Sequence, residues 1–154
     1  MIQQSCQSDL AAPREVVWNA VSRMSGVNDE LWPFLRMTRA GHDDQLFPPH
    51  QDGPVSFSSW ILLFGMLPID RHTLSAHPVG FGFAERSHSW LQRTWRHRRH
   101  LDDIQGGTHL RDEIEFDPRI GVLAPIVETV VRAVFRHRHR RLVLRFGALT
   151  RTSP

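Results

Sequence analysis

Residues 81–116 read FGFAERSHSWLQRTWRHRRHLDDIQGGTHLRDEIEF, and this stretch decides the fold. Apolar residues recur in it at every second position, which is the spacing of side chains that share one face of a β-strand. The pattern is interrupted near Trp90–Gln92 and over Asp102–Gly107, where residues typical of turns gather. These interruptions predict two hairpins that join three antiparallel strands, over residues 81–90, 93–101 and 108–116.

Four polar residues stand in these strands at positions that share a face with apolar ones. They are Glu85, His97, Arg99 and Asp112. If the hairpins turn near residues 91 and 105, Glu85 lies opposite His97, and Arg99 lies close to Asp112 or Leu110. Burying such groups without partners costs several kcal/mol, so we expect them to form either a satisfied internal network or a binding site.

The rest of the chain predicts further strands and three helices. A helix that begins at Pro13 ends near Ser25 and Gly26, and a second helix follows from about Asn28 to Thr38. Residues 40–54 are rich in Gly, Pro and Asp and predict a long loop, of the kind that often covers a site. The other predicted elements are a first strand over 2–10, strands over 55–67 and 70–79, and a last helix over 119–146.

This order of elements resembles the helix-grip fold of the START and Bet v 1 superfamily. Ala12–Trp18 is similar to the start of the first helix in the polyketide cyclase/dehydrase branch, and Phe135–Leu142 resembles the arginine-rich last helix of some bacterial members. The resemblance implies an α+β domain over residues 1–154, in which a curved antiparallel sheet of about six strands wraps around the long C-terminal helix. It also implies an apolar cavity between sheet and helix, which the superfamily uses for lipids, sterols, polyketides or hormones.

We therefore expect the protein to bind a small hydrophobic or amphipathic molecule, of the lipid, polyketide or aromatic acid class, in that cavity. Glu85, His97, Arg99 and Asp112 would orient its polar end. Arg138 of the last helix would lean over the same patch, as His139 could. The predicted walls are Phe57, Trp60, Phe83, Trp95, Leu110, Ile114, Phe135 and Leu142.

Three alternatives remain open from the residues alone. The polar group could be a buried ionic network that only fixes the sheet to the helix. The protein could be an enzyme of the cyclase/dehydrase kind, in which His97 moves a proton and Arg99 stabilises an enolate. The run Arg136–Arg141 could contact nucleic acid or an anionic membrane surface, although acidic residues elsewhere nearly balance it.

Composition narrows the possible chemistry. All 19 cationic residues are arginine, and tyrosine is absent, which excludes Schiff-base lysines, a P-loop lysine and acid catalysis by tyrosine. Acid or base chemistry would therefore fall to His, Asp or Glu. The histidines His97, His100, His137 and His139 lack the spacing of a zinc motif, so we expect no metal and no cofactor.

The chain shows no signal for export or for a membrane span. Cys6 is the one cysteine, so an intramolecular disulfide is impossible and a reducing compartment is expected. The N-terminus lacks the basic start and apolar run of a signal peptide. The apolar segment Trp60–Ile69 is about half as long as a membrane helix. We expect a cytoplasmic protein that takes a small hydrophobic ligand and binds no nucleic acid.

Overall fold

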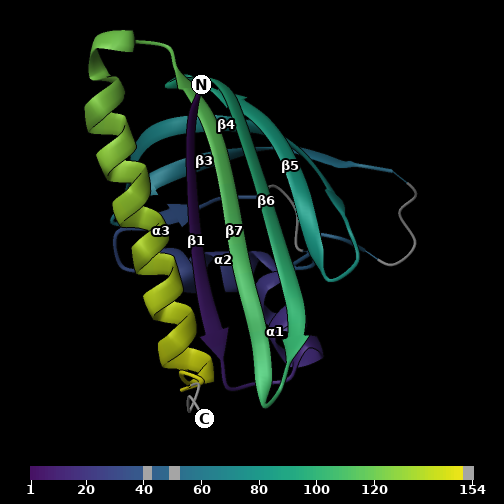
Figure 1. Cartoon of the computed structure of the whole chain (residues 1–154). Helices are drawn as coiled ribbons and strands as arrows, with labels where there is room; N and C mark the ends of the chain where they lie inside the picture. Colours follow the sequence, from purple (N-terminus) through teal and green to yellow (C-terminus); the bar gives the residue numbers. More distant parts are fainter. Residues whose placement is uncertain (40–42, 49–52, 151–154) are drawn as a thin grey trace.

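The computed structural model describes residues 1–39, 43–48 and 53–150 (Figure 1). It contains a strongly curled antiparallel sheet, two short helices and one long C-terminal helix. The elements, in chain order, are β1 (Ile2–Leu10), α1 (Arg14–Val21), α2 (Met24–Leu31), β2 (Leu35–Met37), β3 (Val55–Leu63), β4 (Leu67–Pro78), β5 (Gly82–Ser89), β6 (Gln92–Ile104), β7 (Gly107–Pro118), a 3₁₀ turn (Gly121–Leu123) and α3 (Ala124–Phe146).

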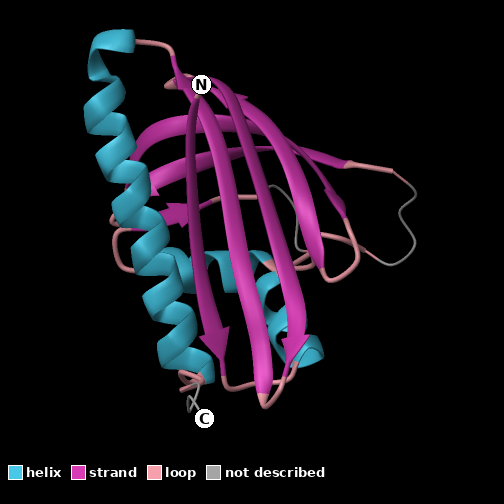
Figure 2. Ribbon diagram, in the orientation of Figure 1, coloured by secondary structure: helices cyan, strands magenta, loops and turns pink. Residues whose placement is uncertain are grey.

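The sheet has seven strands in the order β1-β7-β6-β5-β4-β3-β2. Strands β2 to β7 follow one another along the chain, and β1 closes the order by pairing with β7. Helix α3 packs against β1, β7 and α2, so it lies along one side of the curled sheet, and α1 and α2 cover part of the inner face (Figure 2). This is the predicted helix-grip arrangement. The inner face of the sheet is the one that meets the helices.

The alternation read from the sequence sets the faces of the strands. In β7 the even-numbered residues from Thr108 to Phe116 are buried, and the residues between them are exposed or half-buried. Both predicted hairpins form. Glu85 pairs with His97 as predicted, and of the two expected neighbours of Arg99, Asp112 is its partner while Leu110 pairs with Leu101.

Two apolar clusters make the core. One joins Leu10, Val17 and Val21 to Leu101, Leu110 and Leu142, at the end of the sheet nearest α1. The other joins Ile114 and Phe116 to Val131 and Phe135 of α3, with Trp95 packed beside them. Burial of each such side chain contributes about 1.5–3 kcal/mol, which fixes α3 to the sheet.

The predicted helix over 28–38 is wrong. Helix α2 ends at Leu31, and Trp32 has an extended backbone because it precedes Pro33, which disfavours helical geometry at that position. Leu35 and Met37 then pair with β3 as the short strand β2, which raises the strand count from about six to seven.

The last helix is shorter than predicted. Strand β7 continues to Pro118, the backbone N–H of Arg119 donates to the carbonyl of Leu91, and the α-helix begins only at Ala124. Of the predicted loop over 40–54, residues 40–42 and 49–52 lie outside the described residues. Over the ranges that the structure describes, no helix is long and apolar enough to cross a membrane.

Candidate functional site

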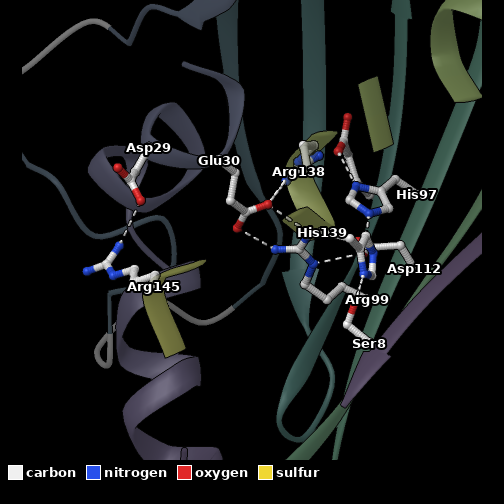
Figure 3. A network of polar contacts seen from close by, with 10 residues as sticks. Ser8, Asp29, Glu30, His97, Arg99, Asp112, Arg138, His139 and Arg145 are labelled. Atoms are coloured by element: carbon white, nitrogen blue, oxygen red, sulfur yellow. Dashed lines mark hydrogen bonds and ion pairs between the residues drawn. The ribbon is translucent and has the colours of Figure 1, made fainter. Parts of the chain in front are cut away.

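Arg99 and Asp112 form the centre of a buried ionic network on the inner face of the sheet (Figure 3). Arg99 Nε donates to Asp112 Oδ1 at 2.8 Å, and its Nη2 donates to Oδ2 at 2.7 Å. This two-point contact is the geometry in which a guanidinium binds a carboxylate most strongly. Both side chains are fully buried.

Helix α2 adds a second carboxylate. Glu30 accepts from Arg99 Nη1 at 2.7 Å and from Nη2 at 2.9 Å, and it accepts from Arg138 Nε of α3 at 2.8 Å. Burial would raise the pKa of Glu30, but the charges of Arg99 and Arg138 outweigh burial and lower it below its usual range. Glu30 thus joins α2, α3 and β6 at one point.

Glu30 was missed in the sequence analysis. A helix drawn from residue 28 hides its position, whereas the real helix begins at Met24 and places Glu30 three residues after Val27 and four after the buried Gly26, which is the spacing of one helix face. The signal was therefore the spacing within α2, and the wrong start of that helix concealed it.

Two histidines complete the shell of Asp112. His97 Nε2 lies 2.7 Å from Oδ1, and His139 Nε2 lies 3.0 Å from Oδ2. Burial would raise the pKa of Asp112, but Arg99 and the two histidines hold it well below its ordinary value. For His139, burial favours a lower pKa, yet its hydrogen bond to Asp112 and the nearby thiol of Cys6 raise the pKa above its usual range.

Glu85 is held less tightly than the other two carboxylates. Its Oε1 accepts from Ser87 Oγ at 2.8 Å, and its Oε2 lies 3.7 Å from His97 Nδ1, which exceeds the length of a hydrogen bond. Burial alone would raise its pKa, but His97 and Ser87 lower it. Glu85 is therefore an ionised acceptor with one oxygen that no short hydrogen bond holds among the described residues.

A cavity of about 70 Å³ lies next to Glu85, beneath α2 and the segment 43–48. Its polar lining is Glu85, His97 and Arg138. Arg99 and Asp112 are absent from the lining, because they lie behind His97 in the closed network. The apolar lining is Met24, Val27, Met37, Leu46, Phe47, Val55, Phe57, Leu74, Ala76 and Phe83.

The predicted apolar walls divide into three groups. Phe57 and Phe83 line the cavity. Trp60 does not line it. It pairs with Arg71 and its ring contacts Trp90 on the outer face, because residue 60 has the opposite parity to residue 57. The remaining five lie in the closed core clusters rather than on the cavity lining, namely Trp95, Leu110, Ile114, Phe135 and Leu142.

The positions of Ser8, His139 and Arg99 limit which side chains could catalyse a reaction in the cavity. Ser8 Oγ lies 2.7 Å from His139 Nδ1, so Ser8, His139 and Asp112 are connected like a hydrolase triad. Neither Ser8 nor His139 lines the 70 Å³ cavity, so a substrate there would not meet this chain of groups. Arg99 is held by both Asp112 and Glu30, and the role of enolate stabiliser would require it to leave them.

The arginine-rich run of α3 is not a continuous basic surface. Arg138 and His139 are buried and bind Glu30 and Asp112, and Arg141 binds Asp29 at 2.9 Å. The register of the helix therefore buries two of the six residues of the run. Within the described ranges, no group of His, Cys, Asp or Glu side chains has the arrangement of a metal site.

Known proteins support the fold. Residues 8–146 match the model of the family described as Domain of unknown function (DUF8410). No curated protein matches the sequence significantly. Similar solved structures include a protein from Chromobacterium violaceum, with TM-score 0.72 and 14% identity over 96% of this chain and 98% of that one.

Two further solved structures are similar to this chain, with comparable TM-scores. A START superfamily protein from Mycobacterium smegmatis has TM-score 0.69 and 11% identity over 94% of this chain and 96% of that one. The Zhui aromatase/cyclase from Streptomyces sp. R1128 has TM-score 0.70 and 13% identity over 92% and 91% of the two chains. At such identities the likeness shows the fold alone, which is START-like and similar to that of polyketide cyclases.

Proposed function

Since the chain belongs to the DUF8410 family over residues 8–146, and its START-like neighbours suggest a ligand-binding fold, we propose that it binds a small amphipathic molecule in the cavity beneath α2. The observation that carries this proposal is that apolar walls and three polar side chains meet at one cavity, where His97 and Arg138 are buried and the side chain of Glu85 is 11% exposed. Glu85 would anchor the polar end of the ligand, and Phe57 and Phe83 would contact its apolar part.

The chemistry of Glu85 selects the kind of polar end. An ionised carboxylate accepts hydrogen bonds and donates none. Its second oxygen is 3.7 Å from His97 Nδ1, so a donor from the ligand would supply the short contact that this oxygen lacks. A hydroxyl or amine provides such a donor, whereas a carboxylic acid would bring a second negative charge. We therefore favour a hydroxylated ligand over the aromatic acids.

The size of the cavity requires that one wall moves. Sites for small molecules usually measure about 300–1,000 Å³, several times the 70 Å³ found. Met24 and Met37 are adaptable because thioether side chains repack easily. Phe47 closes the cavity by packing its ring between Trp18 and Phe83, with centroids 6.1 and 5.8 Å away. Rotation of Phe47 would enlarge the site without disturbing the ionic network.

The name of one neighbour guides the choice of ligand. A structure similar to this chain is called an aromatase/cyclase, so an aromatic compound is a suitable first probe. Turnover is not part of the proposal, since Arg99, the cation expected to stabilise an enolate, is absent from the cavity lining.

The experiment has two stages. Protein purified under native conditions is denatured, and mass spectrometry identifies any small molecule that is released. Binding of a naphthol and of the matching naphthoic acid is then titrated by calorimetry for the wild type, for Glu85→Gln and for the control Glu113→Gln. Glu113 lies on the outer face of β7 and pairs with Arg111.

The wild type should prefer the naphthol, and Glu85→Gln should reduce that preference about tenfold because the repulsion of the naphthoate disappears. The Glu113→Gln variant should behave like the wild type. Equal affinity of the Glu85→Gln and wild-type proteins for both compounds would rule out the anchor. Absence of both a released molecule and any aromatic binding would rule out the cavity as a binding site.

A further inference from the structure

Large apolar side chains gather on the surface at one end of the sheet. They lie in the β5–β6 turn (residues 90–91) and in the connection from β7 into α3 (residues 120–126). The backbone N–H of Arg119 joins the two segments by donating to the carbonyl of Leu91. Val122 is 84% exposed and Trp90 is 61% exposed. We call the two segments together the apolar end.

The strand order places these segments together. In an antiparallel sheet, the end of β5, the start of β6 and the end of β7 lie at the same end of the sheet, and Gln92 pairs with Pro118 there. The side chain of Asp70 reinforces this arrangement, because it accepts from the backbone N–H groups of Trp90 and Leu91. Figure 1 shows the N-terminus and the start of α3 together at the top of the view.

The opposite end of the sheet has a different character. The turns after β4 and β6 lie at that end and contain Gly80, Gln105 and Gly106. Among the described residues of these two turns, Val79 is the one large apolar side chain that is exposed. Soluble proteins rarely expose contiguous apolar patches unless the patch binds a partner or a membrane. The asymmetry between the two ends therefore points to a partner at the apolar end.

Arginines flank the apolar end. Arg71, Arg93 and Arg119 are all exposed there, and Arg71 stacks over the ring of Trp60, which itself contacts Trp90. The carboxylate nearest to them on the surface is Asp117, which lies 3.7 Å from Arg93. Asp70 is buried and held by His72 and the turn. The apolar end thus carries an excess of positive charge.

We propose that the apolar end docks on the surface of an anionic lipid bilayer. Tryptophan and aliphatic side chains on protruding turns suit the boundary between headgroups and acyl chains. The flanking guanidiniums would meet lipid phosphates, which they bind in two-point fashion. The proposal is independent of the internal cavity, because none of these segments lines it.

A vesicle assay tests the proposal. Wild-type protein is sedimented with vesicles of phosphatidylcholine alone and with vesicles that also contain phosphatidylglycerol, at low and high salt. The test variant is Trp90→Ala/Val122→Ser, and the control is Leu144→Ser. Leu144 is 79% exposed, but it lies near the C-terminal end of α3, away from the apolar end. Since all three side chains are exposed, each variant should keep the wild-type circular dichroism spectrum.

The wild type and Leu144→Ser should bind the anionic vesicles, with binding that weakens at high salt, and the double variant should bind about tenfold more weakly. Equal binding of the wild type and the double variant would overturn the proposal, as would failure of the wild type to bind anionic vesicles. Self-association of the wild type that the double variant abolishes, without vesicle binding, would overturn it by assigning the patch to a second copy of the chain.

Discussion

Arg99 on β6 and Asp112 on β7 are paired directly across the two strands, and their side chains form a two-point ion pair from which solvent is fully excluded. Such a pair repays the cost of burial only if every remaining donor and acceptor is also satisfied. Here Glu30, His97 and His139 complete the shell. The ion pair therefore depends on α2 and α3 both being docked.

Replacing Arg99 should be severely destabilising. Arg99→Ala leaves the carboxylates of Asp112 and Glu30 buried with too few donors, and we expect a loss of about 3–5 kcal/mol in the free energy of unfolding. Urea denaturation measures it. The control is Arg98→Ala, since the neighbouring arginine is exposed on the outer face and should cost less than about 0.5 kcal/mol. Similar losses for the two variants would mean that Arg99 is not in a closed network.

Glu30 should contribute more to the free energy of unfolding than its neighbour Asp29. Glu30→Gln removes the charge that holds Arg99 and Arg138, and roughly 3 kcal/mol should be lost. Asp29→Asn breaks exposed pairs with Arg141 and Arg145 and should cost less than about 1 kcal/mol. Unfolding by denaturant compares the two variants, and an equal effect of both would contradict the joining role of Glu30.

Acid should unfold the protein through its buried carboxylates. The pKa values of Asp112, Glu30 and Glu85 are lowered in the folded state, so their contribution to stability is present above the ordinary values of 3.8 and 4.5 and is lost as the pH falls through the lowered ones. The free energy of unfolding should decline from about pH 5 downward. A profile that stays flat to about pH 3 would show that these groups have the same pKa in both states.

His139 should give the opposite pH dependence at neutral to alkaline pH. Its pKa is raised on folding, so its contribution is complete below the ordinary value of 6.5 and is lost as the pH rises through the raised value. Denaturation at a series of pH values should show this loss in the wild type and not in His139→Gln. His88→Gln, a change on the exposed outer face, should retain the wild-type profile. A profile that is the same in all three proteins would contradict the assignment.

Glu85 should be dispensable for stability, unlike Glu30. Its carboxylate has one short hydrogen bond, from Ser87, so Glu85→Gln should change the free energy of unfolding by less than about 1 kcal/mol. The same variant should alter the ligand preference, as proposed above. A loss comparable to that of Glu30→Gln would place Glu85 in the structural network and argue against its role as a ligand anchor.

Much of the fold could be predicted from local patterns. Period-two alternation over residues 81–116 identifies the inner face of three strands, the pair Glu85 and His97, and Asp112 as one of two expected neighbours of Arg99. It predicts the pairs because a hairpin with a short turn allows few registers when one face must be buried. The same rule places Trp60 on the outer face, because it stands three residues from Phe57 and therefore has the opposite parity.

The sequence by itself determined that Glu85, His97, Arg99 and Asp112 share the inner face of the sheet with apolar residues, because strand geometry repeats every two residues and needs no distant contact. Only the tertiary structure decided what those residues do. Glu30 binds Arg99 although the two residues are 69 positions apart in the chain, and this contact completes the network around Arg99 and Asp112. Glu85 and His97 line the cavity instead. Pairing over such a distance depends on how α2 and α3 pack on the curled sheet, and no local period encodes that packing.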